Sequence, residues 1–152
     1  TCALPIYRVE WLKASNGADV LSDVYNANPT AMRLILETFQ TIDAPVDGKK
    51  IAVLADMKEL GEQSAQLHRD MITALDPEKL DLVYLYGEEM LALAEVATDK
   101  FPKGAVKYFR KDSAADEFSE LQAALAKELM PNDQLLLKGS NSMHLSDIVK
   151  GL

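Results

Sequence analysis

The sequence has 152 residues, which is the size of one ordinary domain and too short for two domains that each have a sufficient core of their own. Hydrophobic residues make up 48% and charged residues 26%, a composition typical of soluble globular proteins and unlike that of disordered or fibrous chains. The net charge of −8 excludes a nucleic-acid duplex or an anionic membrane as the main partner, because both attract clusters of Lys and Arg.

The first predicted elements are two strands joined by a tight turn. Residues 8–13 and 19–25 have the pattern of strands, and Asn16 and Gly17 between them are typical turn residues of a hairpin. The strand at residues 8–13 is therefore predicted to form an antiparallel edge of a sheet.

A helix is predicted next, because Asn28 can cap its free amide groups and Pro29 suits its first position. Its apolar face runs through residues 31–42. Beyond it, near-continuous apolar runs alternate with amphipathic segments, and such runs are typical of strands buried on both faces of a parallel sheet. The predicted strands cover residues 51–55, 80–86, 105–109 and 134–137, and the predicted helices cover residues 68–75, 90–97, 118–129 (opened by Asp112 or Ser113) and about 144–149.

Strands that alternate with helices of this length form right-handed βαβ units. We therefore predict an α/β fold, a Rossmann-like three-layer sandwich whose mostly parallel sheet has about six strands and one antiparallel edge strand. No repeat or linker divides the chain, so residues 8–152 are expected to form a single domain. The chain has no initiator Met and reads as a fragment of a longer protein.

The compartment and metal content follow from a few residue types. The single cysteine, Cys2, cannot form an internal disulfide, which indicates a reducing compartment such as the cytoplasm. His68 and His144 do not form a spaced ligand pair, so no metal site is predicted. The longest apolar runs have about five to eight residues, against roughly 20 for a membrane span.

Three polar loops follow predicted strands, and ligands of open α/β sheets bind where such loops enter helices. The first, residues 23–29, offers the carboxylate of Asp23, the phenol of Tyr25 and the amides of Asn26 and Asn28. A carboxylate in this position can accept ribose hydroxyls, and amides can read the edge of a base. Equally, Asn28 can be only a helix cap and Asp23 only a turn residue.

The second loop, residues 56–61, directly follows the most apolar strand. Its charges either hold a charged substrate or form a solvated loop that ends in a glycine turn. His68 lies in the next predicted helix, on its apolar face, where a histidine is more often packed and hydrogen-bonded than a ligand-binding residue.

The third loop, residues 138–142, lies between the last strand and the last helix. Gly139 permits a positive φ, and the following amides with Ser140 can form a nest for an anion. The order of residues is not that of a Walker A loop, and no Gly-x-Gly-x-x-Gly motif follows any strand. The loop is therefore either an anion site or an ordinary connection.

Three segments together resemble the last domain of the Mur ligases: residues 23–32, residues 53–61 followed by His68, and residues 137–143. They occur in the order and at the spacing of that family, and the similarity covers about residues 8–152. Residues 1–7 do not resemble the segment that precedes the arginine of the family, so they read as an atypical or foreign start. Within the family, the resemblance is strongest to the members that add D-Ala-D-Ala to a UDP-N-acetylmuramoyl-tripeptide in peptidoglycan synthesis.

This resemblance implies a three-domain, ATP-dependent and ADP-forming ligase, of which the chain is the carboxy-terminal domain. The amino-terminal domain would hold the UDP-sugar peptide, and the central domain would carry the phosphate-binding loop and the Mg²⁺ ligands. ATP would convert the peptide carboxylate into an acyl phosphate, which the amine of D-Ala-D-Ala attacks. The carboxy-terminal domain would close and exclude water from this intermediate. The fragment alone is expected to be inactive.

The resemblance also implies roles for individual residues. Arg8 would be the catalytic cation that bridges phosphate oxygens, although an edge-strand ion pair with Glu10 is the alternative. Asp23 would accept the ribose hydroxyls of ATP. The adenosine site would be lined by Tyr25, Asn26 and Asn28, and the D-Ala-D-Ala side by Asp56, Met57, His68, Lys138, Gly139 and Ser140.

The expected partners are D-Ala-D-Ala, the UDP-N-acetylmuramoyl-tripeptide and the missing domains of the same enzyme, with no nucleic acid and no membrane, and the enzyme is expected to be a monomer. Two other functions stay open. A sister Mur ligase would add a different amino acid, although the loop at residues 56–61 suits the dipeptide-adding members. A free-standing, non-catalytic nucleotide-binding module would bind ATP without any other domain.

Overall fold

Six strands form one mixed sheet in the order β1-β2-β6-β3-β4-β5. The computed structural model describes residues 9–25 and 27–152 of the chain. Only β1 and β2 pair antiparallel, and every other neighbouring pair is parallel, which confirms the predicted sheet with its antiparallel edge. The strands are β1 (Glu10–Lys13), β2 (Asp19–Asp23), β3 (Lys50–Ala55), β4 (Leu82–Tyr86), β5 (Val106–Phe109) and β6 (Gln134–Lys138).

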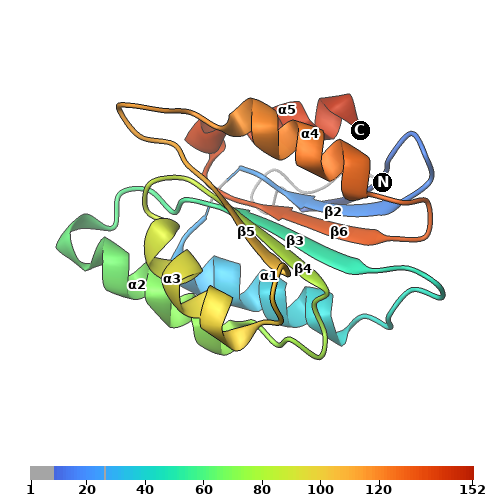
Figure 1. Ribbon diagram of the computed structural model, residues 1–152, viewed down its shortest axis with the longest axis horizontal. Helices are drawn as coiled ribbons and strands as arrows, with labels where there is room; N and C mark the ends of the chain where they lie inside the picture. The colour runs from blue at the N-terminus through green and yellow to red at the C-terminus, as the bar shows by residue number, and fades with distance from the viewer. Residues whose placement is uncertain (1–8, 26) are drawn as a thin grey trace.

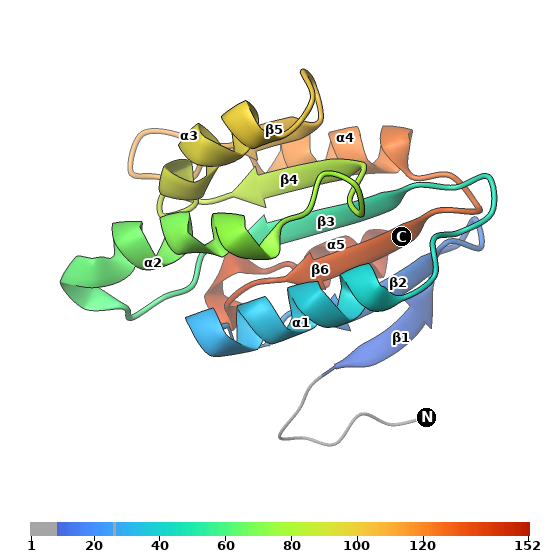
Figure 2. The same cartoon turned by 90° about the horizontal axis from the view of Figure 1, so that it is seen from below.

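Helices cover both faces of this sheet and complete the predicted three layers. Figures 1 and 2 show α1, α2 and α3 on one face and α4 and α5 on the other. In the described part of the chain, none of the helices has both the length and the apolar character that crossing a membrane requires. The helices are α1 (Pro29–Thr41), α2 (Ser64–Asp70), α3 (Leu91–Lys100), α4 (Phe118–Glu128) and α5 (Ser146–Gly151), with short 3-10 turns η1 (Gly61–Gln63), η2 (Met71–Ala74) and η3 (Asn141–Met143).

The two layers of helices enclose two separate hydrophobic cores. One core joins β-strand side chains such as Leu54 to Leu36 of α1 and Leu93 of α3. The other joins side chains such as Val53 to Leu125 of α4 and others of α5. Because neighbouring residues of β3 point into different cores and both are fully buried, the strand is apolar along its length, as the sequence pattern predicts.

The predicted local signals at both ends of β2 are present. Gly17 adopts a φ of 97° in the β1–β2 turn, a conformation that favours glycine. At the start of α1, the Asn28 side chain accepts a hydrogen bond from the amide of Ala31 at 2.8 Å, and Pro29 is the first helical residue. The cap predicted at Asn28 is therefore confirmed.

Two predicted helices have different limits in the structure. The helix predicted at residues 68–75 is divided, because α2 ends at Asp70 and continues only as the 3-10 turn η2. The predicted opening of α4 at Asp112 or Ser113 is wrong. Asp112 instead closes a separate turn by accepting hydrogen bonds from two backbone amides, and α4 begins at Phe118.

Candidate functional site

The connections that follow β6 and its two neighbours leave the sheet on opposite faces. β2 and β3 lead towards α1 and α2 on one face, whereas β6 leads through η3 to α5 on the other (Figure 1). Adjacent strands whose connections diverge leave a crevice beyond their carboxyl ends, and open α/β sheets bind ligands there. By this rule a ligand is expected on each side of the carboxyl end of β6, at the two positions that we name the β2/β6 crevice and the β3/β6 crevice.

The β2/β6 crevice contains a buried ion pair between the last residues of the two strands. Asp23 and Lys138 are register partners, and the Lys138 Nζ lies 2.7 Å from the Asp23 Oδ2. Asp23 is 6% exposed and Lys138 is 1% exposed. Burial raises the pKa of the Asp23 carboxyl, while the hydrogen bond and the charge of Lys138 act in the opposite direction. Two residues predicted for different ligands are thus in direct contact.

The β3/β6 crevice is closed at its base by hydrogen bonds between the two loops. The amide of Ser140 donates to the carbonyl of Asp56 at 3.1 Å, and the amide of Lys58 donates to the Ser140 Oγ at 3.1 Å. The Asp56 side chain is fully buried, and its Oδ1 accepts a hydrogen bond from the amide of Met90 at 2.9 Å. Gly87 leaves room for this carboxylate, because a Cβ there would lie 2.2 Å from the Asp56 Oδ1.

The loop after β2 joins the same cluster. The amide of Asn141 donates to the carbonyl of Tyr25 at 3.0 Å, so all three predicted polar loops meet at one edge of the sheet. Tyr25 presents 47% of its surface to solvent, and Asn28 is exposed as well. The predicted convergence of the loops is confirmed, whereas the ligand assigned to each residue stays a prediction.

Of the two interpretations left open for the loop after β6, the described backbone does not form the anion nest. Gly139 does not adopt a positive φ, and the amides of Ser140 and Asn141 are already bonded to carbonyls of the neighbouring loops. Glycine is required for a different reason: a Cβ at position 139 would lie 2.7 Å from the Cβ of Ala55 and 3.1 Å from the Cδ1 of Leu145. The glycine allows β3 and the β6 loop to pack closely.

His68 and Met57 lie inside the domain. The His68 Nε2 accepts a hydrogen bond from the amide of Met57 at 3.0 Å, and its Nδ1 contacts the carbonyl of Ser64 at 2.8 Å. These partners require the neutral tautomer in which Nδ1 carries the proton. His68 is fully buried. Met57 is 1% exposed and belongs to the core between the sheet and helices α1 and α3. Both side chains therefore support the loop after β3 from the interior of the domain. Their predicted contact with a substrate stays a prediction.

Two predicted site residues, Arg8 and Asn26, lie outside the described residues. Conversely, the sequence analysis considered the charges of residues 56–61 together and gave Lys58 no role of its own. The Lys58 ammonium lies 3.3 Å from the buried Asp56 Oδ2, and 42% of its side chain is exposed. A lysine two residues after a strand-end aspartate was the available signal, but such charges also occur in ordinary solvated loops.

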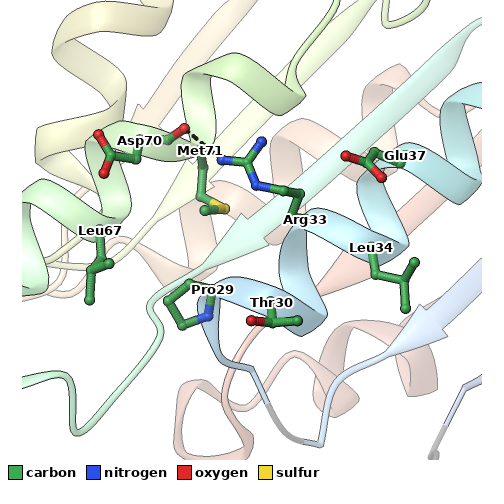
Figure 3. Close-up of a pocket in the computed structure, with 8 residues that line it drawn as sticks. All are labelled: Pro29, Thr30, Arg33, Leu34, Glu37, Leu67, Asp70 and Met71. Carbon is green, nitrogen blue, oxygen red and sulfur yellow. Dashed lines mark hydrogen bonds between the residues drawn. The ribbon is translucent and has the colours of Figure 1, made fainter.

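A hollow of about 390 Å³ lies in the helical layer between α1, α2 and η2. Figure 3 shows Arg33 pointing across it, where its guanidinium donates to the carbonyl of Asp70 at 3.1 Å. Its other lining residues include Leu34, Leu67 and Met71, and it contains none of the predicted site residues. We therefore place the candidate site at the strand ends and not in this hollow.

Residues 7–141 match the family described as Mur ligase, glutamate ligase domain. The UDP-N-acetylmuramoyl-tripeptide–D-alanyl-D-alanine ligase of Bacillus subtilis is 33% identical over 147 residues, which cover 95% of this chain and 30% of that protein. The ligase of the same name from Mycobacterium tuberculosis is 30% identical over 165 residues, covering 100% and 32%. The chain thus spans about a third of the length of these relatives.

Two solved structures share the fold over nearly the whole chain. MurF ligase from Thermotoga maritima in complex with ADP superimposes with a TM-score of 0.70 at 25% identity, covering 97% of this chain and 30% of that one. MurF from Acinetobacter baumannii superimposes with a TM-score of 0.73 at 26% identity, covering 95% and 30%. With the match over residues 7–141, these likenesses show that the chain belongs to the Mur ligase family and constitutes its glutamate ligase domain.

Proposed function

We propose that this chain is the carboxy-terminal domain of a cytoplasmic ATP-dependent ligase that adds D-Ala-D-Ala to a UDP-N-acetylmuramoyl-tripeptide in peptidoglycan synthesis. The names and extent of the related ligases support the reaction class. The observation that carries the proposal is the set of polar side chains placed on both sides of the carboxyl end of β6, at the β2/β6 and β3/β6 crevices. One contains the Asp23–Lys138 ion pair, and the other contains Lys58 and Ser140. The reaction has three substrates, and we assign two of them, ATP and the dipeptide, to these adjacent positions.

The β2/β6 crevice fits the nucleotide. The Asp23 Oδ2 is held by Lys138, and the described residues give the other oxygen, Oδ1, no hydrogen bond. An ionised carboxylate accepts hydrogen bonds only, so Oδ1 can accept a ribose hydroxyl. The exposed ring of Tyr25 offers an aromatic surface for the base, and the exposed Asn28 amide offers two further donors. We assign the adenosine part of ATP to these residues.

The β3/β6 crevice fits the amine substrate. Ser140, Asp56 and Lys58 form its polar rim, and the buried Met57 and His68 hold that rim in place. ATP supplies the phosphoryl group that makes the tripeptide carboxyl group reactive. The residues of this domain then hold the dipeptide with its amino group towards that carbonyl carbon and keep water away when the domain closes.

The metal ion is not assigned to this domain. The described residues contain no group of three or more His, Cys, Asp or Glu side chains placed to hold a metal. We assign the Mg²⁺ ligands to the central domain of the ligase, together with the phosphate-binding loop. Arg8 keeps its proposed place as the cation beside the transferred phosphate.

The test is the reaction of the full-length protein that contains this domain. With ATP, Mg²⁺ and UDP-N-acetylmuramoyl-tripeptide, phosphate release should depend on D-Ala-D-Ala, and mass spectrometry should show the pentapeptide product. L-Ala-L-Ala, which has the same charges but opposite chirality, is the matched control. If a single amino acid stimulates ADP formation and D-Ala-D-Ala does not, the protein is a sister Mur ligase.

The 152-residue chain itself provides a second test. As a closing domain it supplies only one wall of the nucleotide site, so it should show no turnover and little heat of ATP binding in calorimetry. Measurable ATP affinity without the other domains would instead support a free-standing nucleotide-binding module.

A further inference from the structure

The backbone of Lys58 is fixed from two sides. Its own amide donates to the Ser140 Oγ at 3.1 Å, and the amide of the preceding residue, Met57, donates to the buried His68 at 3.0 Å. Lys58 is therefore held at the rim between β3 and β6, the two strands in the middle of Figure 2. A side chain placed this firmly at a strand end is suited to binding rather than to general solvation.

The ammonium of Lys58 is held on one side and open on the other. It lies 3.3 Å from the Asp56 Oδ2, and Asp56 is fully buried with its Oδ1 bonded to the amide of Met90. An ammonium has three N–H donors, and the described residues engage only one of them. With 42% of the side chain exposed, the remaining donors can reach a ligand in the crevice.

The other cations at this edge are placed differently. Lys138 is buried against Asp23. Arg110 follows β5, two strands away, and forms an ion pair with Asp112 in which the arginine is half exposed. Lys111, next to it, pairs with a half-exposed aspartate. Lys58 thus differs from these cations of the carboxyl edge, because its exposed ammonium has a fully buried carboxylate as its partner.

The substrate of the proposed function supplies a matching group. D-Ala-D-Ala reacts through its amino group, and its two methyl side chains carry no charge, so its terminal carboxylate is the remaining ionic group. A carboxylate binds best to charged donors in a fixed position. The Ser140 hydroxyl accepts from the Lys58 amide and can still donate its own proton to the same carboxylate.

We propose that Lys58, assisted by the Ser140 hydroxyl, binds the terminal carboxylate of the D-Ala-D-Ala dipeptide and so selects a free dipeptide acid over an amide or ester. This inference rests on the proposed ligase function and adds the residue that recognises the second substrate. It assigns Asp56 a supporting role, since its buried carboxylate positions the ammonium.

The first experiment compares Lys58→Met with Lys103→Met, an exposed lysine in the loop between α3 and β5 at the opposite edge, in the full-length ligase. Lys58→Met should raise KM for D-Ala-D-Ala by about 10- to 100-fold, the effect of one lost charge-assisted hydrogen bond. KM for ATP and for the UDP-tripeptide should not change. Lys103→Met should match the wild type, and Lys58→Arg should recover part of the loss. An equal rise in all three KM values would give Lys58 only a structural role and overturn the proposal.

The second experiment changes the ligand and leaves the wild-type fold intact. The wild type should use D-alanyl-D-alanine amide, which lacks the terminal charge, with a KM raised by a similar factor, about 10- to 100-fold. Lys58→Met should no longer distinguish the acid from the amide, because the interaction is already lost. If the variant keeps the full preference for the acid, or if the wild type accepts both equally, Lys58 does not bind the carboxylate. A wild type that makes no product from D-Ala-D-Ala would overturn the ligase function as well.

Discussion

Two buried lysines lie at opposite ends of the sheet and have different partners. Lys50, the first residue of β3, is 2% exposed and donates to the carbonyls of Phe39, at 2.6 Å, and Ile42. Lys138, the last residue of β6, is 1% exposed and donates to the carboxylate of Asp23 at 2.7 Å. One charge therefore meets the end of a helix, and the other meets an opposite charge.

The partners indicate what each lysine does. The last carbonyls of a helix have no intrahelical donor and carry a partial negative charge, so Lys50 satisfies the end of α1. Asp133, at the same amino edge of the sheet, also satisfies backbone groups of the fold. Its carboxylate accepts hydrogen bonds from the amides of Lys49 and Met130. At the carboxyl edge, by contrast, polar groups link loops and leave exposed donors. The polar groups of the amino edge complete the fold, and those of the carboxyl edge form the candidate site.

The largest effect should follow from Lys138→Met, because it leaves the Asp23 carboxylate buried without its cation. The free energy of unfolding of the chain should fall by about 3–5 kcal/mol, measured by urea denaturation, and the full-length ligase should lose its activity. The double variant Asp23→Asn/Lys138→Met should recover much of the stability but none of the activity. A single variant as stable as the double variant would show that the two side chains do not form a pair.

Lys50→Met should have a smaller effect, confined to stability. Loss of the two hydrogen bonds to the end of α1 destabilises the fold, but removal of a buried charge offsets part of this loss. The free energy of unfolding should therefore fall by only about 1–2 kcal/mol. The kcat and KM values of the full-length ligase should not change. A loss of activity comparable to that of Lys138→Met would contradict the division between the two edges.

The Lys50 variant also has a characteristic pH dependence. Burial, with a smaller contribution from the charge of Lys79, lowers the pKa of the Lys50 ammonium below its ordinary value of 10.5. The unfolded chain therefore binds more protons than the folded chain as the pH approaches 10.5, and the Lys50 contribution to stability rises with pH in this range. The stability of the wild type relative to Lys50→Met should increase accordingly, as urea denaturation at successive pH values would show.

The fold was largely predictable because its signals are local. The apolar runs, the turn at Gly17 and the cap at Asn28 act within a few residues. The helix predicted at residues 68–75 failed for a long-range reason. The Gln40 side chain of α1 donates to the carbonyl of Ala74 at 2.6 Å and accepts from the amide of Asp76, which draws the chain out of the helix before β4. Apolar spacing contains no information about such a contact.

The meeting of the three polar loops was predictable from the sequence, but the contacts within the candidate site were not. Parallel strands bring their carboxyl ends together, so the meeting of the three loops followed from the order of strands and helices. The pairing of Asp23 with Lys138 joins residues 115 positions apart and depends on β6 inserting beside β2. Gly139 shows a second limit, because a glycine needed for close packing and a glycine needed for a positive φ look the same in a sequence.

The smallest predicted effects concern two tyrosines of β4. Tyr86 lies at the carboxyl end of this strand, and Tyr84 lies two residues before it. The hydroxyl of Tyr86, at the carboxyl end, donates to Asp116 at 2.7 Å, whereas no described residue bonds to the buried hydroxyl of Tyr84. Tyr86→Phe should cost about 1 kcal/mol at neutral pH, and Tyr84→Phe should be neutral or slightly stabilising. Burial raises the pKa of Tyr84 to about 12, so its variant should differ only in the alkaline range, where the wild type loses stability as the pH rises above 10.

Burial and the bond to Asp116 raise the pKa of Tyr86 as well, so Tyr86→Phe should share the alkaline effect and should show a further pH dependence in acid. The hydrogen bond from Tyr86 is the main cause that lowers the pKa of the Asp116 carboxyl below 3.8. The resulting stability is present above that pH and is lost as the pH falls through the lowered pKa, because both states then bind the proton. The cost of Tyr86→Phe should therefore shrink in acid, while that of Tyr84→Phe should not change there. Equal costs for the two variants at neutral pH would mean that the bond to Asp116 does not stabilise the carboxyl edge.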